Sequence, residues 1–182
     1  MLSKIISKKR LVGISAYILS LIILGSFTAK TLNIILPLDK SVVPSFFQIL
    51  IANLSTSSIL MLCNLFWGSG ILGVTYLSFF LGLQFYSVII AYGTHNLLYI
   101  ILILAIHGTF ELFAMAIICS ASIDILSIWK NYLFGSVNSI KNEYKYFFKN
   151  TFINGMILIF IFILVGSILE IGISSNLFKL LV

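Results

Sequence analysis

Charged side chains are scarce in this chain. Only 9% of its 182 residues are Asp, Glu, Lys or Arg, whereas 60% are hydrophobic. A soluble domain carries roughly 25% charged residues, so this chain has too little polar surface to face water on all sides. The composition excludes a soluble globular protein and predicts an all-α integral membrane protein, because membrane-spanning helices of roughly 20 residues each consume most of its length.

Residue types that build metal centres and disulfides are scarce as well. The chain has two histidines and two cysteines, and Cys63 and Cys119 both lie in apolar runs. Their spacing predicts no disulfide or metal framework. His107 and Glu111 form H-x-x-x-E, which supplies two zinc ligands where a hydrolase normally needs three, and lacks the H-E-x-x-H pattern. We therefore expect no metal, no other cofactor and no enzymatic activity.

Basic residues give the chain a net charge of +6. Residues 1–10 form a basic N-terminus, and a second group of lysines follows residue 129. Both groups flank apolar segments, as the positive-inside rule describes for membrane proteins. We expect the lipid bilayer, and no nucleic acid, to be the partner of these charges.

Apolar stretches long enough to cross a bilayer occur five times in the chain. The pattern predicts a polytopic helical bundle whose membrane core is residues 46–175. The expected spans are residues 11–29, 46–66, 71–91, about 109–128 and 152–173, and residues 176–182 form a tail.

The apolar stretch 97–128 is too long for one perpendicular span. As a continuous helix it would be about 48 Å long, against a hydrocarbon core of roughly 30 Å. We expect a break at His107 and Gly108, with residues 97–106 re-entrant or interfacial and a span beginning near Thr109. A continuous, tilted helix that extends past the membrane is the alternative.

Residues 129–150 form the one long hydrophilic segment. Lys141, Lys145 and Lys149 recur every four residues, while Tyr144 and Phe147 occupy a different helical face. This spacing predicts an amphipathic helix that lies on an anionic membrane surface.

Five crossings place the N-terminus and residues 129–150 on the same side of the membrane. The positive-inside rule assigns that side to the cytoplasm. The external loops then carry only Lys30, Asp39 and Lys40 as charged residues. Asp124 falls near the cytoplasmic end of its span, where Lys130 or water is its expected partner, and Trp67 and Trp129 are interpreted as anchors at the inner interface.

Several polar side chains share the outer half of the predicted membrane region. Helical rise places Asn53 about 10 Å inside its span and Glu170 about 27 Å along the last one. Polar groups are costly in lipid, so we expect them to converge in one intramembrane cluster. The predicted site consists of Asn53, Gln84, His107, Gly108, Glu111 and Glu170.

Four interpretations of this cluster stay open at the level of sequence. It can be a hydrogen-bonded core that fixes helix register. It can be a pathway for a substrate, ion or proton, which intramembrane carboxylates often mark. It can also be a docking groove for a partner protein, or a catalytic metal site.

The segment from His107 to Glu111 resembles the HGxxE hallmark of the stage II sporulation protein M family of bacterial membrane proteins. Asn53, Gly68, Gly73 and Thr75 match the family's Asn-containing span and glycine-rich turn, and Glu170 matches a glutamate near its last helix end. The resemblance covers about residues 46–175. The family's NGxxxG element is reduced here to Gly82, so the chain resembles a divergent member.

This resemblance implies a non-enzymatic protein of the bacterial cytoplasmic membrane. The family's namesake is a scaffold for peptidoglycan-degrading partners in spore engulfment, and similar small proteins occur in gene clusters for circular bacteriocins. We expect a component of a peptide maturation, secretion or immunity assembly. The alternatives are a scaffold for cell-envelope remodelling and an intramembrane metalloenzyme. Implied partners are other membrane proteins, such as an ABC transporter or an envelope complex, and a second copy of the chain.

Overall fold

The computed structural model describes residues 6–37, 46–135 and 139–174. Within these ranges, the side chains of His95, Tyr99, Ile103, Leu104, Ile106, His107, Ile173 and Ser174 lie outside the described part. The described residues form helices and no strand, so the predicted all-α class is confirmed.

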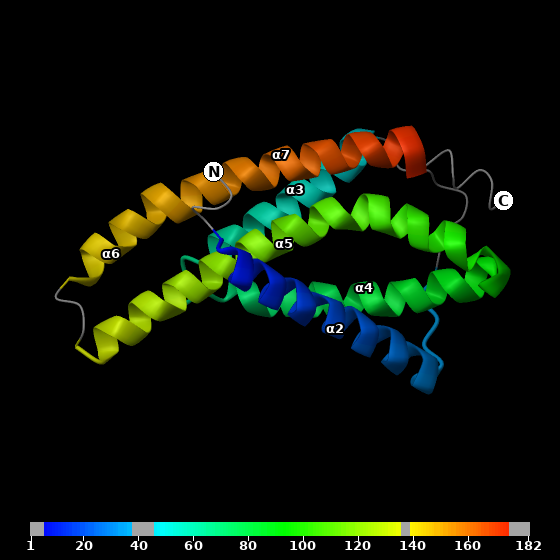
Figure 1. Cartoon of the computed structure of the whole chain (residues 1–182), viewed down its shortest axis with the longest axis horizontal. Helices are drawn as coiled ribbons and strands as arrows, with labels where there is room; N and C mark the ends of the chain where they lie inside the picture. Colours follow the sequence, from blue (N-terminus) through cyan, green and yellow to red (C-terminus); the bar gives the residue numbers. More distant parts are fainter. Residues whose placement is uncertain (1–5, 38–45, 136–138, 175–182) are drawn as a thin grey trace.

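The helices run back and forth along one long axis (Figure 1). Among the described residues, five helices are long and apolar enough to cross a membrane, when the helical stretch Ile140–Gly172 is counted as one helix. This confirms the predicted five spans. The helices are α2 (Lys8–Leu32), α3 (Phe46–Cys63), α4 (Gly70–Tyr92), α5 (Leu97–Leu133), α6 (Ile140–Phe147) and α7 (Ile153–Leu169). Shorter helical segments are η1 (Thr94–Asn96) and two π-helical segments, η2 (Phe148–Phe152) and η3 (Glu170–Ser174).

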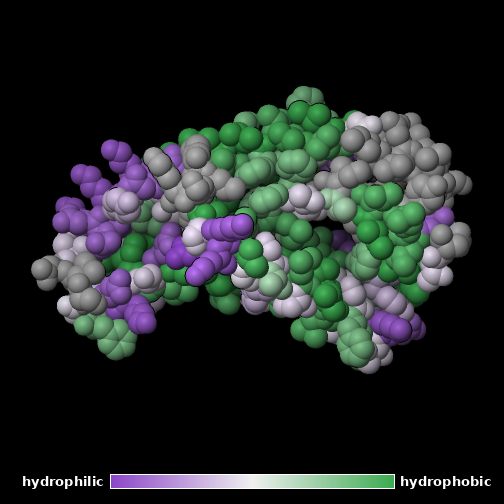
Figure 2. All heavy atoms as spheres, viewed as in Figure 1, coloured by the Kyte–Doolittle hydropathy of each residue, from purple (hydrophilic) through white to green (hydrophobic). Residues whose placement is uncertain are grey.

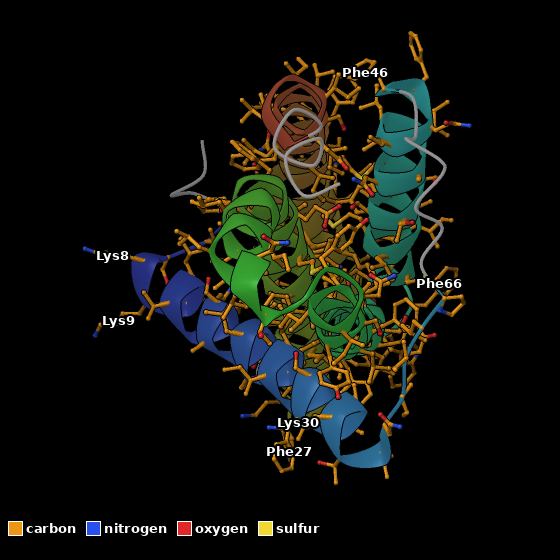
Figure 3. The ribbon with its side chains drawn as sticks, turned by 90° about the vertical axis from the view of Figure 1, so that its right-hand side faces the viewer. Lys8, Lys9, Phe27, Lys30, Phe46 and Phe66 are labelled. Carbon is orange, nitrogen blue, oxygen red and sulfur yellow. The ribbon has the colours of Figure 1, made fainter. Side chains whose placement is uncertain are left out.

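The bundle is built around α5. In its apolar part 56% of the residues are buried inside the protein, against 6% in α3. Figure 3 shows α3 standing at one side of the bundle, with α5 and α4 between it and α2. All but one residue of α3 are therefore exposed or half-buried, and in a bilayer the exposed ones meet lipid tails.

Two glycines let α2 and α4 approach closely. A Cβ atom on Gly82 would lie 2.1 Å from the Ile22 carbonyl oxygen, and one on Gly25 would lie 2.1 Å from the Phe79 carbonyl oxygen. The Ser26 hydroxyl donates to the Gly82 carbonyl at 2.9 Å. Small residues at a helix crossing are the usual means of association in membranes, where the hydrophobic effect does not drive helices together.

The expected break at Gly108 is wrong, because α5 is one continuous helix of 37 residues. A broken helix at membrane depth leaves backbone amides and carbonyls unsatisfied, whereas a glycine inside a helix costs only about 1 kcal/mol. The Thr109 hydroxyl also bonds to the Ala105 carbonyl one turn back, on the same helix. The helix, about 55 Å long by its rise, instead curves along its length (Figure 1).

The expected amphipathic helix within residues 129–150 is present as α6, and its contact with an anionic membrane surface stays a prediction. The end of α5 and α6 form a hairpin, and α6, η2, α7 and η3 continue as one rod from Ile140 to Ser174 (Figure 1). Phe147, on the apolar face of α6, is only 2% exposed, and the Trp129 indole donates to the Tyr144 hydroxyl at 2.7 Å. Part of the aromatic face that was expected to meet the membrane therefore packs on the protein.

Candidate functional site

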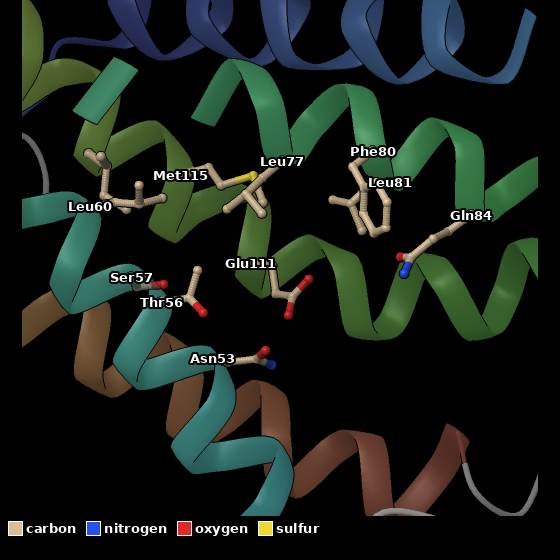
Figure 4. Close-up of a pocket in the computed structure, with 11 residues that line it drawn as sticks. Asn53, Thr56, Ser57, Leu60, Leu77, Phe80, Leu81, Gln84, Glu111 and Met115 are labelled. Carbon is tan, nitrogen blue, oxygen red and sulfur yellow. The ribbon is translucent and has the colours of Figure 1, made fainter. Parts of the chain in front are cut away.

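A cavity of about 230 Å³ lies between α3, α4 and α5 and is partly open to the surroundings. We call it the Glu111 cavity. Figure 4 shows α3 and α4 on its two sides and α5 across its base. Its lining residues are Asn53, Thr56, Ser57 and Leu60 of α3, Leu77, Phe80, Leu81 and Gln84 of α4, and Glu111, Met115 and Ile118 of α5.

Three residues of the predicted polar cluster meet at this cavity. Asn53, Gln84 and Glu111 come from three different helices, and each is half-buried. In Figure 4 the Glu111 carboxylate lies between the Asn53 and Gln84 amides. Asn53 lies seven residues after the start of α3, and Gln84 lies eight residues before the end of α4. Because α3 and α4 are antiparallel, the two side chains lie at about the same level.

Of the remaining predicted residues whose side chains are described, Glu170 does not line the Glu111 cavity, and neither does Gly108. Glu170 lies in η3, which packs against α5. Because Gly166 of α7 sits against Phe110 of α5, the antiparallel arrangement puts Glu170 one turn further toward the start of α5. Gly108 is half-buried, and nothing within 4 Å would meet a Cβ atom there. The His107 side chain lies outside the described residues.

Asn64 is a polar residue that the sequence interpretation missed. It is fully buried, and its amide nitrogen donates to the Ile118 carbonyl at 3.0 Å. Its side-chain oxygen accepts from the Ser122 hydroxyl at 2.6 Å and from the Gly70 amide at 3.1 Å. These bonds fix the α3–α4 turn on α5. The signal in the sequence was an amide residue at the end of an apolar run, just before a glycine-rich turn.

Asp124 pairs with Arg10, and not with Lys130 as expected. The Arg10 guanidinium lies 2.6 Å from the Asp124 carboxylate and 3.2 Å from the Ser120 hydroxyl. Residues 124 and 130 are six positions apart on α5 and therefore point from different faces of the helix. The first turn of α2, capped by the Ser7 hydroxyl at the Arg10 amide, brings the guanidinium to α5.

The two tryptophans expected as separate interface anchors stack on each other. The rings of Trp67 and Trp129 are 4.4 Å apart between centroids and nearly parallel, with an angle of 6°. Trp67 and Gly68 both have positive φ, and a Cβ atom on Gly68 would lie 2.7 Å from the Ser122 carbonyl oxygen. The tight turn between α3 and α4 therefore seats Trp67 beside the end of α5.

Hydrophilic residues gather over α6 and the end of α5, at one end of the molecule, and over the start of α2, nearer its middle (Figures 1 and 2). Lys8 and Lys9 point away from the bundle there, whereas Lys30 lies near the opposite end of α2 (Figure 3). Lys141, Lys145 and Lys149 of the predicted surface-binding segment are exposed. This basic end combines α2, α5 and α6, although these segments are far apart in sequence.

Comparison with protein-family models, with curated proteins and with solved structures gave no match.

The Glu111 cavity combines one carboxylate, which accepts hydrogen bonds, with the amides of Asn53 and Gln84 and the hydroxyls of Thr56 and Ser57, which can donate as well as accept. The rest of its lining is apolar. Among the described residues, no three His, Cys, Asp or Glu side chains come together as a metal site. The arrangement suits a ligand that carries a few polar groups on an apolar body.

Proposed function

We propose that the chain is a non-enzymatic membrane component of a peptide maturation, secretion or immunity assembly, of the kind that serves circular bacteriocins. The observation that carries this proposal is the Glu111 cavity, a partly open site with both polar and apolar lining residues inside an apolar bundle. The resemblance of the segment from His107 to Glu111 to the stage II sporulation protein M family supports the same class of protein. The proposed location is the bacterial cytoplasmic membrane, with the N-terminus in the cytoplasm.

The cost of the polar lining argues for a ligand. A carboxylate and two amides at membrane depth are expensive and usually mark a functional site. A purely structural network would be closed and fully buried, as it is around Asn64. Asn53, Gln84 and Glu111 are instead half-buried around open space.

The exposure of α3 also supports an incoming hydrophobic ligand. Met61 is the one fully buried residue of this helix, and α3 packs more extensively against α7 than against α4, so its contact with α4 offers little resistance to a small displacement. A peptide that reaches the cavity from the bilayer would pass between these two helices.

A scaffold for envelope-remodelling proteins is the second candidate. The α5–α6 hairpin favours it, because it extends the helices at the basic end and presents Lys141 and Lys145 to the surroundings. Such a surface can hold an acidic partner or anionic lipid.

Photocrosslinking in cells separates the two candidates. A photoreactive amino acid at Thr56, on the cavity lining, should capture a small peptide, while one at the exposed Ile23 of α2 should not. A third position, Lys145, reports on partners of the hairpin. Capture of a large envelope protein from position 145, with no peptide from position 56, would replace the first proposal with the scaffold.

A further inference from the structure

The end of the α5–α6 hairpin exposes large apolar side chains. Leu133 is 69% exposed and Phe134 is 80% exposed, and Tyr132 beside them is exposed as well. We call Tyr132, Leu133 and Phe134 the hairpin tip. Neighbouring apolar side chains that are exposed together commonly mark a surface that contacts a membrane or another protein. The hairpin tip therefore calls for a partner outside the helical bundle.

The distance along α5 places the hairpin tip close to the membrane. Trp129 stacks on Trp67, and one turn earlier Asp124 binds Arg10 of the first turn of α2. Tryptophans and basic residues at the end of a span are typical of the membrane interface. Phe134 follows Trp129 by five residues, which corresponds to about 7.5 Å of helical rise. The head-group layer on each side of a bilayer is about 5 to 7 Å thick, so the tip lies near the outer edge of this layer.

The exposed apolar surface of α5 continues without a break to the hairpin tip. Leu126 and Leu133 are both exposed and lie seven residues apart, and therefore on one face of the helix. Side chains of a helix lean toward its N-terminus. In α5 that direction leads back into the span, so Tyr132 and Leu133 lean toward the bilayer. Lipid can cover them without a second protein.

The charges around the hairpin tip favour an anionic membrane surface. Residues 129–150 contain four lysines and one glutamate, a net charge of +3. Lys130 just before the tip and Lys141 at the start of α6 are both exposed. Lysines beside an inserted apolar group attract anionic lipid head groups. An acidic protein would meet the lysines as well, but it would have to displace lipid from the apolar tip.

We propose that the hairpin tip binds anionic phospholipid of the leaflet at the basic end, with Leu133 and Phe134 in the head-group layer and Lys130 at lipid phosphate. The α5–α6 hairpin is then a membrane attachment in addition to the five spans. The content of anionic lipid in that leaflet sets how firmly the hairpin is held. This inference does not depend on peptide binding in the Glu111 cavity, and its test leaves that proposal untouched.

Spin labels measure the depth of the hairpin tip in the purified full-length chain. In a background with Cys63 and Cys119 replaced by alanine, a nitroxide is attached at Phe134→Cys, and its collisions with a neutral, water-soluble nickel chelate are counted. Ile59→Cys, exposed on α3 within a span, and free label in buffer give the lipid and water ends of the scale. In vesicles of equal parts phosphatidylcholine and phosphatidylglycerol, position 134 should collide severalfold less often than free label.

A matched pair of charge variants tests the role of anionic lipid. Lys130→Gln should raise the collision rate at position 134 in the mixed vesicles, whereas Lys30→Gln, in the last turn of α2, should leave it unchanged. Vesicles of phosphatidylcholine alone should raise it further, because every lysine of the hairpin then loses its counter-charge. Circular dichroism checks that each variant folds, and a label at Leu133→Cys repeats the measurement if the Phe134→Cys chain does not.

The other outcomes count against the proposal. Collisions at position 134 as frequent as those of free label would overturn it and leave the hairpin tip in water. Equal shielding with and without phosphatidylglycerol would retire the preference for anionic lipid. Exposure in vesicles together with shielding in native membranes would assign the tip to a protein partner, in agreement with the scaffold candidate.

Discussion

At the scale of single residues, Asn64 connects the turn between α3 and α4 to α5 and to the start of α4 through hydrogen bonds. Its amide uses one donor and two acceptor bonds, to Ile118, Ser122 and Gly70. Because the residue is fully buried, water cannot replace any of these bonds after a substitution.

Asn64→Leu should lower the free energy of unfolding by about 2 kcal/mol or more, since it leaves buried donors and acceptors unsatisfied. Asn154→Leu is the matched control, because its amide bonds to the Asn150 carbonyl at an exposed site, and a change within about 0.5 kcal/mol is expected. Titration with a denaturing detergent, followed by circular dichroism, measures both. Equal losses in the two variants would contradict the role assigned to Asn64.

At this scale, the depth of a side chain in the membrane could be predicted in part from the sequence, whereas the residue with which a side chain pairs could not. Helical rise and the alternation of direction between spans placed Asn53 and Gln84 at a common level, whereas the predicted level of Glu111 depended on the break at Gly108, which is wrong. The pairing of Arg10 with Asp124 depends on which face α2 presents to α5, and no local pattern contains that information. Asn64 was missed because its position at a span end favoured a turn residue open to water.

At the scale of helices, the two glycine positions on α4 and α5 have opposite packing. Gly82 touches the backbone of α2, and Gly108 has open space around it. Both lie inside continuous helices, so the intrinsic helix propensity of glycine is the same for the two.

Gly82→Ala should destabilise the protein by about 1 to 3 kcal/mol, because the added methyl group pushes α2 away from α4. Gly108→Ala should be neutral or stabilising by up to about 1 kcal/mol, because alanine favours a helix and meets no neighbour. Unfolding of both variants in detergent checks the contrast. A loss at position 108 as large as at position 82 would argue for a break or a hidden contact at Gly108.

The five spans could be predicted because length and apolar composition are local properties. The continuous course of α5 through Gly108 could not, since it results from competition between bilayer thickness and backbone hydrogen bonding. The contact of Tyr144 of α6 with Trp129 of α5 could not be predicted either, because an apolar helix face suits a membrane and a neighbouring helix equally well.

At the scale of the whole molecule, charge is distributed along the long axis. Lys8 begins α2 and Lys145 lies in α6, whereas Lys30 lies in the last turn of α2. An apolar body between two polar ends is the form that a bilayer requires.

Single cysteines should reveal which end faces the cytoplasm. In a background with Cys63 and Cys119 replaced by alanine, a membrane-impermeant thiol reagent should label position 30 in intact cells and leave positions 8 and 145 unlabelled. Broken cells, in which all three positions should react, provide the control. Labelling of positions 8 and 145 from outside would reverse the proposed orientation, and labelling of only one of them would contradict the five crossings.

The central claim is that the Glu111 cavity is open to small solutes at membrane depth. In the same cysteine-free background, Thr56→Cys on the cavity lining should react with a small methanethiosulfonate reagent. Ile59→Cys, exposed on α3 outside the cavity, should stay unreactive, because lipid tails surround it. No reaction at position 56, or equal reaction at both positions, would contradict the account.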